Sequence, residues 1–258
     1  ADISLGTWYP MGGMYHFIAA FEKIAKENGV KILTNHEVTG IKKEGKNVTH
    51  VSTIHGDIET DILISGADYQ HTDDKILEKD ANYSNEYWDK RTMAPSSLLF
   101  YLGINKKLEG LEHHNLFFDE DFEQHASEIY QNPTWPSAPL FYASVPSITD
   151  KSVAPEGCEN LFLLVPIAPD LKDDEATRER YFDLLMSRLE AKTGQKIKEH
   201  IIYKRSFCLD DFKKDYHAFK GNAYGLANTL KQTAIFIISE IPAPNSLFGR
   251  VFKKLESI

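Results

Sequence analysis

Apolar residues along the chain recur first with a helical period and then with strand-like spacing, and this order limits the folds open to the chain. Between residues 12 and 28 apolar side chains recur at helical spacing, charged residues fill the opposite face and Gly29 supplies a stop, which predicts one amphipathic helix. A short strand is predicted at 30–34. Glycine-containing turns then separate three segments typical of a β-meander, at 37–43, 47–54 and 57–60. A helix followed by short strands predicts a mixed chain of the α+β or α/β class.

A continuous apolar run comes directly after the predicted meander. Residues 61–65 read Asp-Ile-Leu-Ile-Ser and lead into Gly66, Ala67 and Asp68. Runs of this kind are typical of strands that are buried on both faces. The sequence therefore predicts a buried strand whose carboxyl end carries a glycine.

The chain changes character from about residue 71. A polar helical patch at 73–87 precedes an aromatic strand at 97–104. A helix is expected at 174–193, from an acidic first turn to Gly194. No regular structure is expected at 132–139, where three prolines fix the backbone. Further strands are predicted at 114–118, 139–145 and 160–166.

Composition narrows the class of protein. The chain has 29 basic and 38 acidic side chains among 258 residues, a formal charge of −9, and its basic residues are scattered, so it does not look like a nucleic-acid binder. Apolar residues at 42% are ample for a packed core. Cys158 and Cys208 stand fifty positions apart without a CxxC neighbour, so neither a disulfide framework nor a zinc site is predicted and a reducing compartment is expected.

The chain shows little sign of membrane insertion. Its longest purely apolar stretch, at 234–238, is far below the ~20 residues of a spanning helix. The opening residues have neither an initiator Met nor the features of a secretory signal, so we expect a cytoplasmic chain entered midway. Residues 246–258 form the pattern of a small basic amphipathic helix, for which docking on the protein's own surface is favoured over lying peripherally on an anionic membrane.

Catalytic motifs are weak when the residues are considered alone. The sequence contains no GxSxG, HExxH, P-loop or GxGxxG motif. His113 and His114 are adjacent, but neighbours in a strand point to opposite faces, so they are not expected to share a metal. The acidic clusters at 119–121 and 173–175 are expected to be solvated. No catalytic residue and no metal ligand is therefore predicted.

Two glycine-containing patches are more informative. Gly12 and Gly13 stand immediately before the first predicted helix, where a backbone without side chains can approach a ligand closely and amide groups are exposed. A second patch of small residues, at 220–230, has the same character. It fits either against a flat ligand or into a plain turn, and the residues leave both open.

Several motifs taken together, in order, are recognisable. The chain resembles the phytoene desaturase family of carotenoid-modifying flavoenzymes, which is related to the flavin amine oxidases. The resemblance runs from about residue 1 to 236. It is carried by segments at 6–14, 35–41, 64–72, 95–103, 113–118, 147–157 and 220–225.

The resemblance implies a body of two parts. One part belongs to a Rossmann-type FAD-binding domain with a β-meander, and the other is a substrate domain whose mixed or antiparallel sheet, with helices, floors an apolar tunnel for a polyene. On this pattern residues 1–70 remain from the FAD-binding domain and 71–225 form the substrate domain. Residues 226–258 are then a return segment with a divergent tail.

The resemblance also implies particular site residues. Val38 corresponds to the contact with adenine, and Gly66, Ala67 and Asp68 to the pyrophosphate end. The residues expected to flank the flavin ring are Gly12, Gly13, Gly221, Asn222 and Ala223. The residues expected at the polyene cavity are Phe100, Tyr101, Phe141 and Tyr142, and alternation along a strand lets only one of each adjacent pair face inward.

The expected function follows from the same resemblance. We expect an FAD-dependent desaturase that introduces double bonds into a C40 or C30 carotenoid polyene. The alternatives are an isomerase, saturase or oxygenase on the same scaffold, and a non-catalytic polyene-binding fragment. The GxGxxG turn of the family is missing and the sequence departs from the pattern after Phe236, so we expect that this chain alone does not retain FAD.

Overall fold

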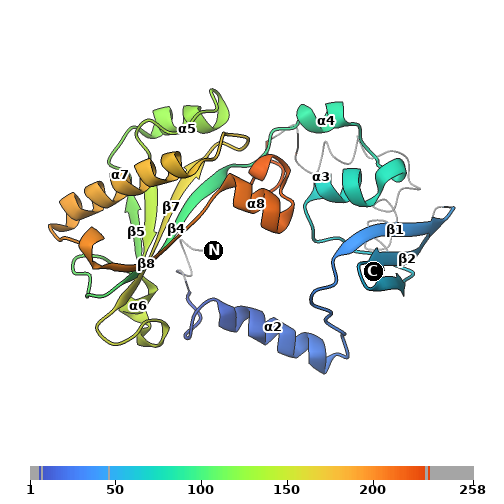
Figure 1. The fold of residues 1–258 in the computed structure, drawn as a ribbon, viewed down its shortest axis with the longest axis horizontal. Helices are drawn as coiled ribbons and strands as arrows, with labels where there is room; N and C mark the ends of the chain where they lie inside the picture. Colours follow the sequence, from blue (N-terminus) through green and yellow to red (C-terminus); the bar gives the residue numbers. More distant parts are fainter. Residues whose placement is uncertain (1–5, 7, 46, 230–231, 233–258) are drawn as a thin grey trace. The chain divides into compact units, whose positions relative to one another are not determined.

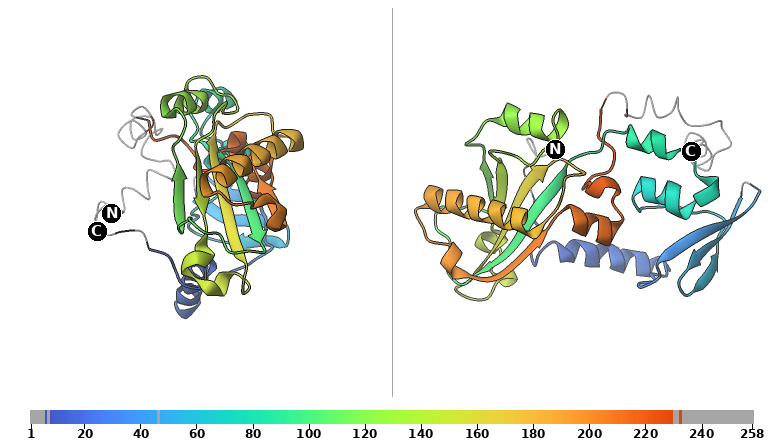
Figure 2. Two further views of the ribbon diagram at one scale, coloured as in Figure 1. Left: turned by 90° about the vertical axis from the view of Figure 1, so that its left-hand side faces the viewer. Right: turned by 45° about the horizontal axis from the view of Figure 1, so that its top comes forward.

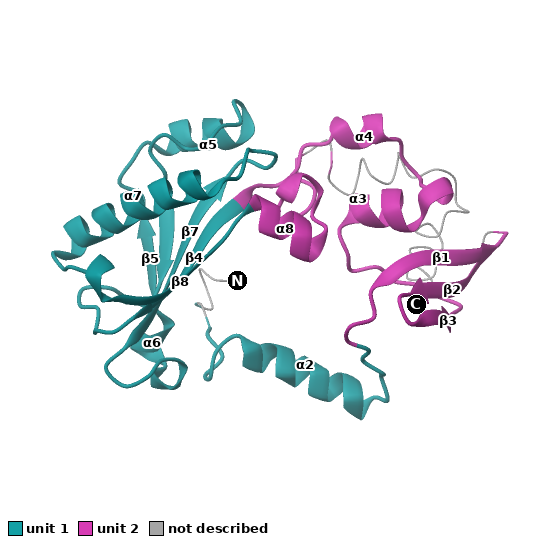
Figure 3. Ribbon diagram, in the orientation of Figure 1, with its two compact units in different colours: residues 1–33, 97–208 teal, residues 34–96, 209–258 magenta. Residues whose placement is uncertain are grey.

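The computed structural model describes residues 6, 8–45, 47–229 and 232. The chain divides into two compact units (Figure 3). Unit 1 comprises residues 1–33 and 97–208, and unit 2 comprises residues 34–96 and 209–258. These units are defined by how the chain packs. The boundaries predicted at residues 70 and 225 instead separate a cofactor-binding domain from a substrate domain, and that division stays a prediction.

Unit 1 is built on a five-stranded sheet with the order β5-β6-β7-β4-β8 (Figure 1). The neighbours β5 and β6, β6 and β7, and β4 and β8 are antiparallel. Four strands confirm predicted segments, and the fifth, β8, has exposed polar residues and was not predicted. The strands are β4 (Ser96–Ile104), β5 (His114–Phe117), β6 (Phe141–Ser144), β7 (Glu159–Ile167) and β8 (Ile201–Phe207).

Helix α7 (Glu175–Thr193) covers one face of this sheet (Figure 2). Asp174 caps its first turn by accepting from the Thr177 amide, and Gly194 ends it with a φ of 67° that glycine adopts without strain. Five of its side chains are buried, so the unit's core lies between the helix and the sheet. Shorter elements complete the unit: α5 (Phe122–Tyr130), α6 (Pro146–Thr149), η3 (Lys151–Val153) and η4 (Lys198–His200).

Helix α2 (Tyr15–Glu27) confirms the first predicted helix but buries none of its residues. Its apolar stripe, which includes Phe17, Ile18 and Phe21, is exposed. The strand predicted at 30–34 is wrong, because these residues have no strand structure. A strand persists only when neighbours satisfy its backbone groups, and no described segment pairs with this one.

Unit 2 contains the predicted meander, an antiparallel sheet of β1 (Val38–Glu44), β2 (Asn47–Thr53) and β3 (Gly56–Glu59). The buried strand predicted at 61–65 is wrong. Residues 61–65 form no strand, and Ile62 and Ile64 are 65% and 83% exposed. The apolar run has the composition of a strand covered on both faces, but no described strand pairs with it and only Leu63 of the five residues is partly buried.

The helical patch predicted at 73–87 is broken into short pieces. Asp73 is fully buried, and its carboxylate accepts hydrogen bonds from the Asn82 and Tyr83 amides and from the Trp88 indole, which folds the chain back on itself. The pieces are α3 (Tyr69–His71), η1 (Thr72–Ile76), η2 (Glu78–Asp80) and α4 (Asn85–Asp89). Helix α8 (Leu209–Tyr216) and η5 (Phe219–Gly221) complete unit 2.

Within the described ranges, no helix has both the length and the apolar character required to cross a bilayer. Among the residues that the structure describes, neither Cys158 nor Cys208 forms a disulfide. The apolar stretch at 234–238 and the amphipathic helix predicted at 246–258 lie outside the described residues.

Candidate functional site

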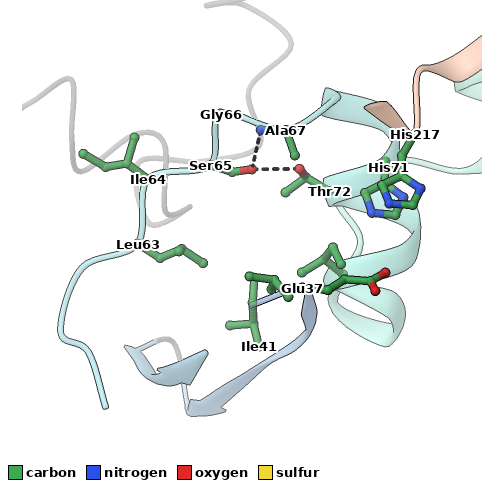
Figure 4. A pocket seen from close by; sticks show the side chains of 12 residues that line it. Glu37, Ile41, Leu63, Ile64, Ser65, Gly66, Ala67, His71, Thr72 and His217 are labelled. Atoms are coloured by element: carbon green, nitrogen blue, oxygen red, sulfur yellow. Dashed lines mark hydrogen bonds between the residues drawn. The ribbon is translucent and has the colours of Figure 1, made fainter. Parts of the chain in front are cut away.

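Unit 2 contains two neighbouring cavities that share Gly66 and Ala67. The first, cavity A, has a volume of about 350 Å³ and is drawn in Figure 4. Its walls come from the meander, from the extended segment after it and from the start of the α3–η1 turn. The lining residues are Glu37, Val38, Ile41, Leu63, Ile64, Ser65, Gly66, Ala67, His71, Thr72, Ile76 and His217.

The second cavity, cavity B, has a volume of about 490 Å³. Its walls come from residues 66–69, from α8 and from the small-residue patch that the sequence singled out. The lining residues are Gly66, Ala67, Asp68, Tyr69, Phe212, Tyr216, Ala218, Asn222, Ala223 and Gly225. The structure thus brings together Val38, residues 66–68 and residues 222–223, which are far apart in the sequence, around two adjoining cavities, and their role in binding stays a prediction.

Asp68 fixes the wall of cavity B. One carboxylate oxygen accepts from the His71 amide at 3.1 Å and caps α3. The other accepts from the Phe219 amide at 3.2 Å and from the Asn222 side chain at 3.4 Å. Asp68, which we expect beside the pyrophosphate, therefore links the start of α3 to the segment at 219–222.

Gly221 has a packing role rather than a place in either cavity lining. It is buried, its φ is +66°, and a Cβ at this position would lie 2.8 Å from the Leu209 carbonyl oxygen. Glycine is required here because the backbone of α8 approaches directly. A place for Gly221 beside a bound flavin stays a prediction.

Gly12 and Gly13 lie in unit 1, whereas the other predicted cofactor residues lie in unit 2. The Gly12 amide donates to the Asp150 carboxylate, and a Cβ on Gly13 would lie 3.5 Å from Val153. Bonds from the Ser152 hydroxyl, the Gly12 amide and the Ser152 amide lower the pKa of Asp150. An amide expected to meet a ligand is therefore already bonded within the protein.

Cavity A contains a stacked histidine pair that the sequence analysis missed. The rings of His71 and His217 lie 4.2 Å apart and nearly parallel, and the Glu37 carboxylate lies on the same side of the cavity (Figure 4). Burial, followed by the neighbouring His217, lowers the pKa of His71 despite the opposing influence of Asp68 and Glu37. Glu37 lies in the 35–41 motif next to Val38, so its place near the cofactor site could have been predicted. No local sequence pattern links His71 to His217.

The sheet of unit 1 carries a row of rings on the face opposite α7. Tyr101 lies 5.1 Å from Phe162, Phe162 lies 6.3 Å from Tyr142, and Tyr142 lies 6.0 Å from His114, measured between ring centroids. These four residues come from β4, β7, β6 and β5 in turn and are called the aromatic row below. None of them is buried. The row therefore presents an aromatic surface across four strands.

Phe100 and Phe141 face the other way. Phe100 is fully buried against Phe182 of α7, and Phe141 stacks on Phe117 beneath the Arg188 guanidinium. Of each predicted pair, only the tyrosine reaches the open face. Strand alternation allows only one residue of each pair on that face, and the burial of Phe100 and Phe141 makes the two phenylalanines part of the core.

His113 and His114 lie closer than strand alternation predicted. Their ring centroids are 4.3 Å apart, because β5 begins only at His114 and the alternation rule does not extend to His113. His113 also lies near the Tyr9 ring, and burial together with His114 lowers its pKa. Over the described part of the chain, no group of three or more metal-ligating side chains is present.

Comparison with known proteins places the chain among flavoenzymes. A family model described as flavin containing amine oxidoreductase matches residues 3–249. A carotenoid 3,4-desaturase of Haloarcula japonica is 39% identical over 236 residues, which is 91% of this chain and 48% of that protein. A 4,4'-diaponeurosporene oxygenase of Staphylococcus aureus is 30% identical over 251 residues, 96% of this chain and 50% of that protein. The chain thus spans about half the length of these curated relatives.

Two solved structures share the fold at low sequence identity. An oxidoreductase from Methanosarcina mazei has a TM-score of 0.52 and 18% identity, covering 77% of this chain and 43% of its own. A protein from Pyrococcus furiosus has a TM-score of 0.53 and 20% identity, covering 76% and 43%. At this identity the likeness concerns the fold alone.

Proposed function

Because this chain belongs to the flavin-containing amine oxidoreductase family, we propose that it contributes the polyene-binding sheet and part of the cofactor site of an FAD-dependent carotenoid desaturase. The proposed reaction introduces double bonds into an apolar C40 or C30 polyene. Support comes from the name of the Haloarcula japonica relative and from its identity over 91% of this chain.

The aromatic row is the observation that carries this proposal. Conjugated polyenes are flat and apolar, and they gain contact area by lying across aromatic rings. Tyr101, Phe162 and Tyr142 offer such a surface without a charged side chain among them, and α7 leaves their face of the sheet open. The row therefore suits a long apolar ligand better than a polar one.

Cavities A and B suit a dinucleotide such as FAD. Val38, Ile41 and Leu63 give cavity A apolar walls for a flat ring. The Glu37 carboxylate offers an acceptor for ribose hydroxyls, the chemistry that acidic residues supply in dinucleotide sites. A Cβ on Gly66 would meet nothing within 4 Å, so the backbone between the two cavities is open to close approach.

The protein's share of the chemistry is binding and orientation. When bound, FAD supplies a hydride acceptor, so that loss of hydride from one carbon and of a proton from its neighbour leaves a double bond. The aromatic row holds the polyene and keeps water away from the side of the polyene that lies against the rings. No residue of this chain is assigned the proton transfer.

The polyene part of this proposal is tested by binding. Phe162→Lys places a charge in the middle of the row and should abolish co-elution of lycopene, supplied in detergent micelles, with the purified chain in gel filtration. Leu184→Lys is the matched control, because Leu184 is a partly exposed residue of α7 rather than of the row. Equal lycopene binding by both variants would contradict the proposal.

An oxygenase is the second candidate, favoured by the name of the Staphylococcus aureus relative. The mass of the product distinguishes the reactions when the protein is supplied with FAD and a polyene. Desaturation removes hydrogen, saturation adds hydrogen, oxygenation adds oxygen, and isomerisation leaves the mass unchanged. A chain that binds the polyene but forms no product would instead be the non-catalytic fragment.

A further inference from the structure

A third cavity adjoins one end of the aromatic row, within unit 1. It has a volume of about 320 Å³, and it is called the end pocket below. Tyr101 belongs both to the row and to this pocket. The far wall is formed by Val153, the last residue of η3, and by Ala154, Pro155 and Cys158 of the turn between η3 and β7.

Gly103 lines the end pocket, and its lack of a side chain makes the pocket deeper. It pairs with Tyr203 across β4 and β8 and lies on the same face as Tyr101, two residues away. A Cβ on Gly103 would lie 3.2 Å from the Tyr203 Cβ and 3.7 Å from a side-chain carbon of Ile202. Glycine inside a strand often marks a place where a ligand approaches the backbone.

The pocket exposes apolar groups to solvent. Ile202 and Tyr203 are 64% and 56% exposed, and Val153, Ala154 and Pro155 lie opposite them. Because exposed apolar surface is costly in water, a contiguous patch of this kind indicates a binding site. Its chemistry fits an apolar ligand end.

The one charge in the lining is already compensated. Glu159 is buried, accepts from the Ser147 hydroxyl and pairs with Lys107 at 3.0 Å. Lys107 also donates to the Cys158 carbonyl at 3.0 Å. These bonds hold the wall in place and leave no buried charge that calls for an ionic ligand.

We propose that the end pocket receives the terminus of an apolar isoprenoid chain that lies along the aromatic row, and that Gly103 sets the depth to which the terminus enters. This inference rests on the proposed function and adds to it the place where the end of the substrate is recognised. A polyene with a compact linear end is then accepted, and a bulky ring at that end is disfavoured.

Cys158 provides a direct probe, because it lines the end pocket and is partly exposed whereas Cys208 is buried. The chain is reacted with a maleimide in detergent micelles with or without lycopene, and the modified cysteine is identified by mass spectrometry. Lycopene at nine times its dissociation constant should slow modification of Cys158 about tenfold. β-Carotene, which has ring-shaped ends, should protect Cys158 much less.

Two variants distinguish binding in the end pocket from binding on the aromatic row. Ala154→Trp fills the pocket and should remove the protection of Cys158 while lycopene still co-elutes with the chain. Glu156→Trp places the same side chain on the same turn but outside the pocket, where Glu156 is exposed, and should leave protection unchanged.

The outcomes are distinguishable. If lycopene co-elutes but does not protect Cys158, the proposal that its terminus enters the end pocket is wrong, whereas the proposed function is unaffected. The same proposal is wrong if lycopene still protects Cys158 in Ala154→Trp. Absence of lycopene co-elution overturns both the proposed function and this inference.

Discussion

Single buried polar residues hold the irregular parts of unit 2 in place. Asp73 is fully buried, and four donors on Asn82, Tyr83 and Trp88 converge on its carboxylate at 2.7–3.1 Å. These bonds replace the regular backbone pattern that a continuous helix over residues 73–87 would have used. The segment's shape therefore depends on one side chain.

Asp73→Leu should destabilise the chain by roughly 3–5 kcal/mol, because it leaves several buried donors without an acceptor. Urea unfolding followed by tryptophan fluorescence measures the loss. Asp74→Leu is the matched control on the next residue, which is only partly buried and bonds to the side chains of Gln70 and Lys75. Equal losses in the two variants would show that the Asp73 network contributes nothing special.

Gly221→Ala should destabilise the chain by about 2–4 kcal/mol, the sum of a positive-φ cost and an overpacking cost. The new Cβ would meet the backbone of Leu209 at 2.8 Å. Gly157→Ala shares the backbone cost, with a φ of +76°, but its Cβ would meet nothing within 4 Å. A thermal shift no larger than that of Gly157→Ala would refute the packing role of Gly221.

At the scale of elements, Glu190 connects the last turns of α7 to the start of η4, the short helix before β8. Its carboxylate accepts from the amides of Ile197 and Lys198 at 2.6 and 2.7 Å. Partial burial raises the pKa of Glu190, but the two amide bonds and the nearby lysines outweigh it, so the folded value lies below the ordinary 4.5. The connection is therefore held by an ionised carboxylate.

Glu190→Gln should lower the melting temperature at pH 7 and reduce its fall in acid. A lowered folded pKa means that the stabilisation is fully present above 4.5 and is lost as the pH drops through the folded value. Melting curves between pH 7 and pH 3 measure the difference. Glu199→Gln, at an exposed residue of η4, is the control and should leave the pH dependence of the melting temperature unchanged. If Glu190→Gln also left that dependence unchanged, the role assigned to the Glu190 carboxylate would be wrong.

At the scale of the whole molecule, unburied apolar surface on α2 is a dominant feature. Phe17→Lys with Phe21→Lys should reduce the binding of the dye ANS and any self-association, while changing stability by about 0.5 kcal/mol or less, because α2 buries no residue. ANS fluorescence and analytical ultracentrifugation measure these effects. Unchanged ANS binding would mean that the exposed surface lies elsewhere, as on Ile62 and Ile64.

A protein of these 258 residues alone should not retain FAD through gel filtration. Cavities A and B provide apolar walls and acceptors, but the sequence contains no GxGxxG turn to place a helix N-terminus against the pyrophosphate. Absorbance at about 450 nm, where bound flavin absorbs, measures retention. Stoichiometric flavin after gel filtration would show that the cavities of unit 2 suffice.

Elements whose local signals agree with their surroundings could be predicted from the amino-acid sequence. The meander, the α7 helix with its Asp174 and Gly194 caps and four strands of the unit 1 sheet follow from periodicity and turn residues. The order of the quoted motifs also identified the family, which the comparisons confirm. These features depend on residues within a few positions of one another.

Features that depend on partners far away in the sequence became known only from the folded chain. Residues 30–34 and 61–65 have strand composition, yet no described strand pairs with them, so they form no strand. Periodicity left open which member of each aromatic pair faces α7, and the packing of that helix put Phe100 and Phe141 in the core. The stack of His71 on His217, 146 residues apart, has no local signal. Burial and pairing are properties of the folded chain, because each needs a neighbour that local sequence does not specify.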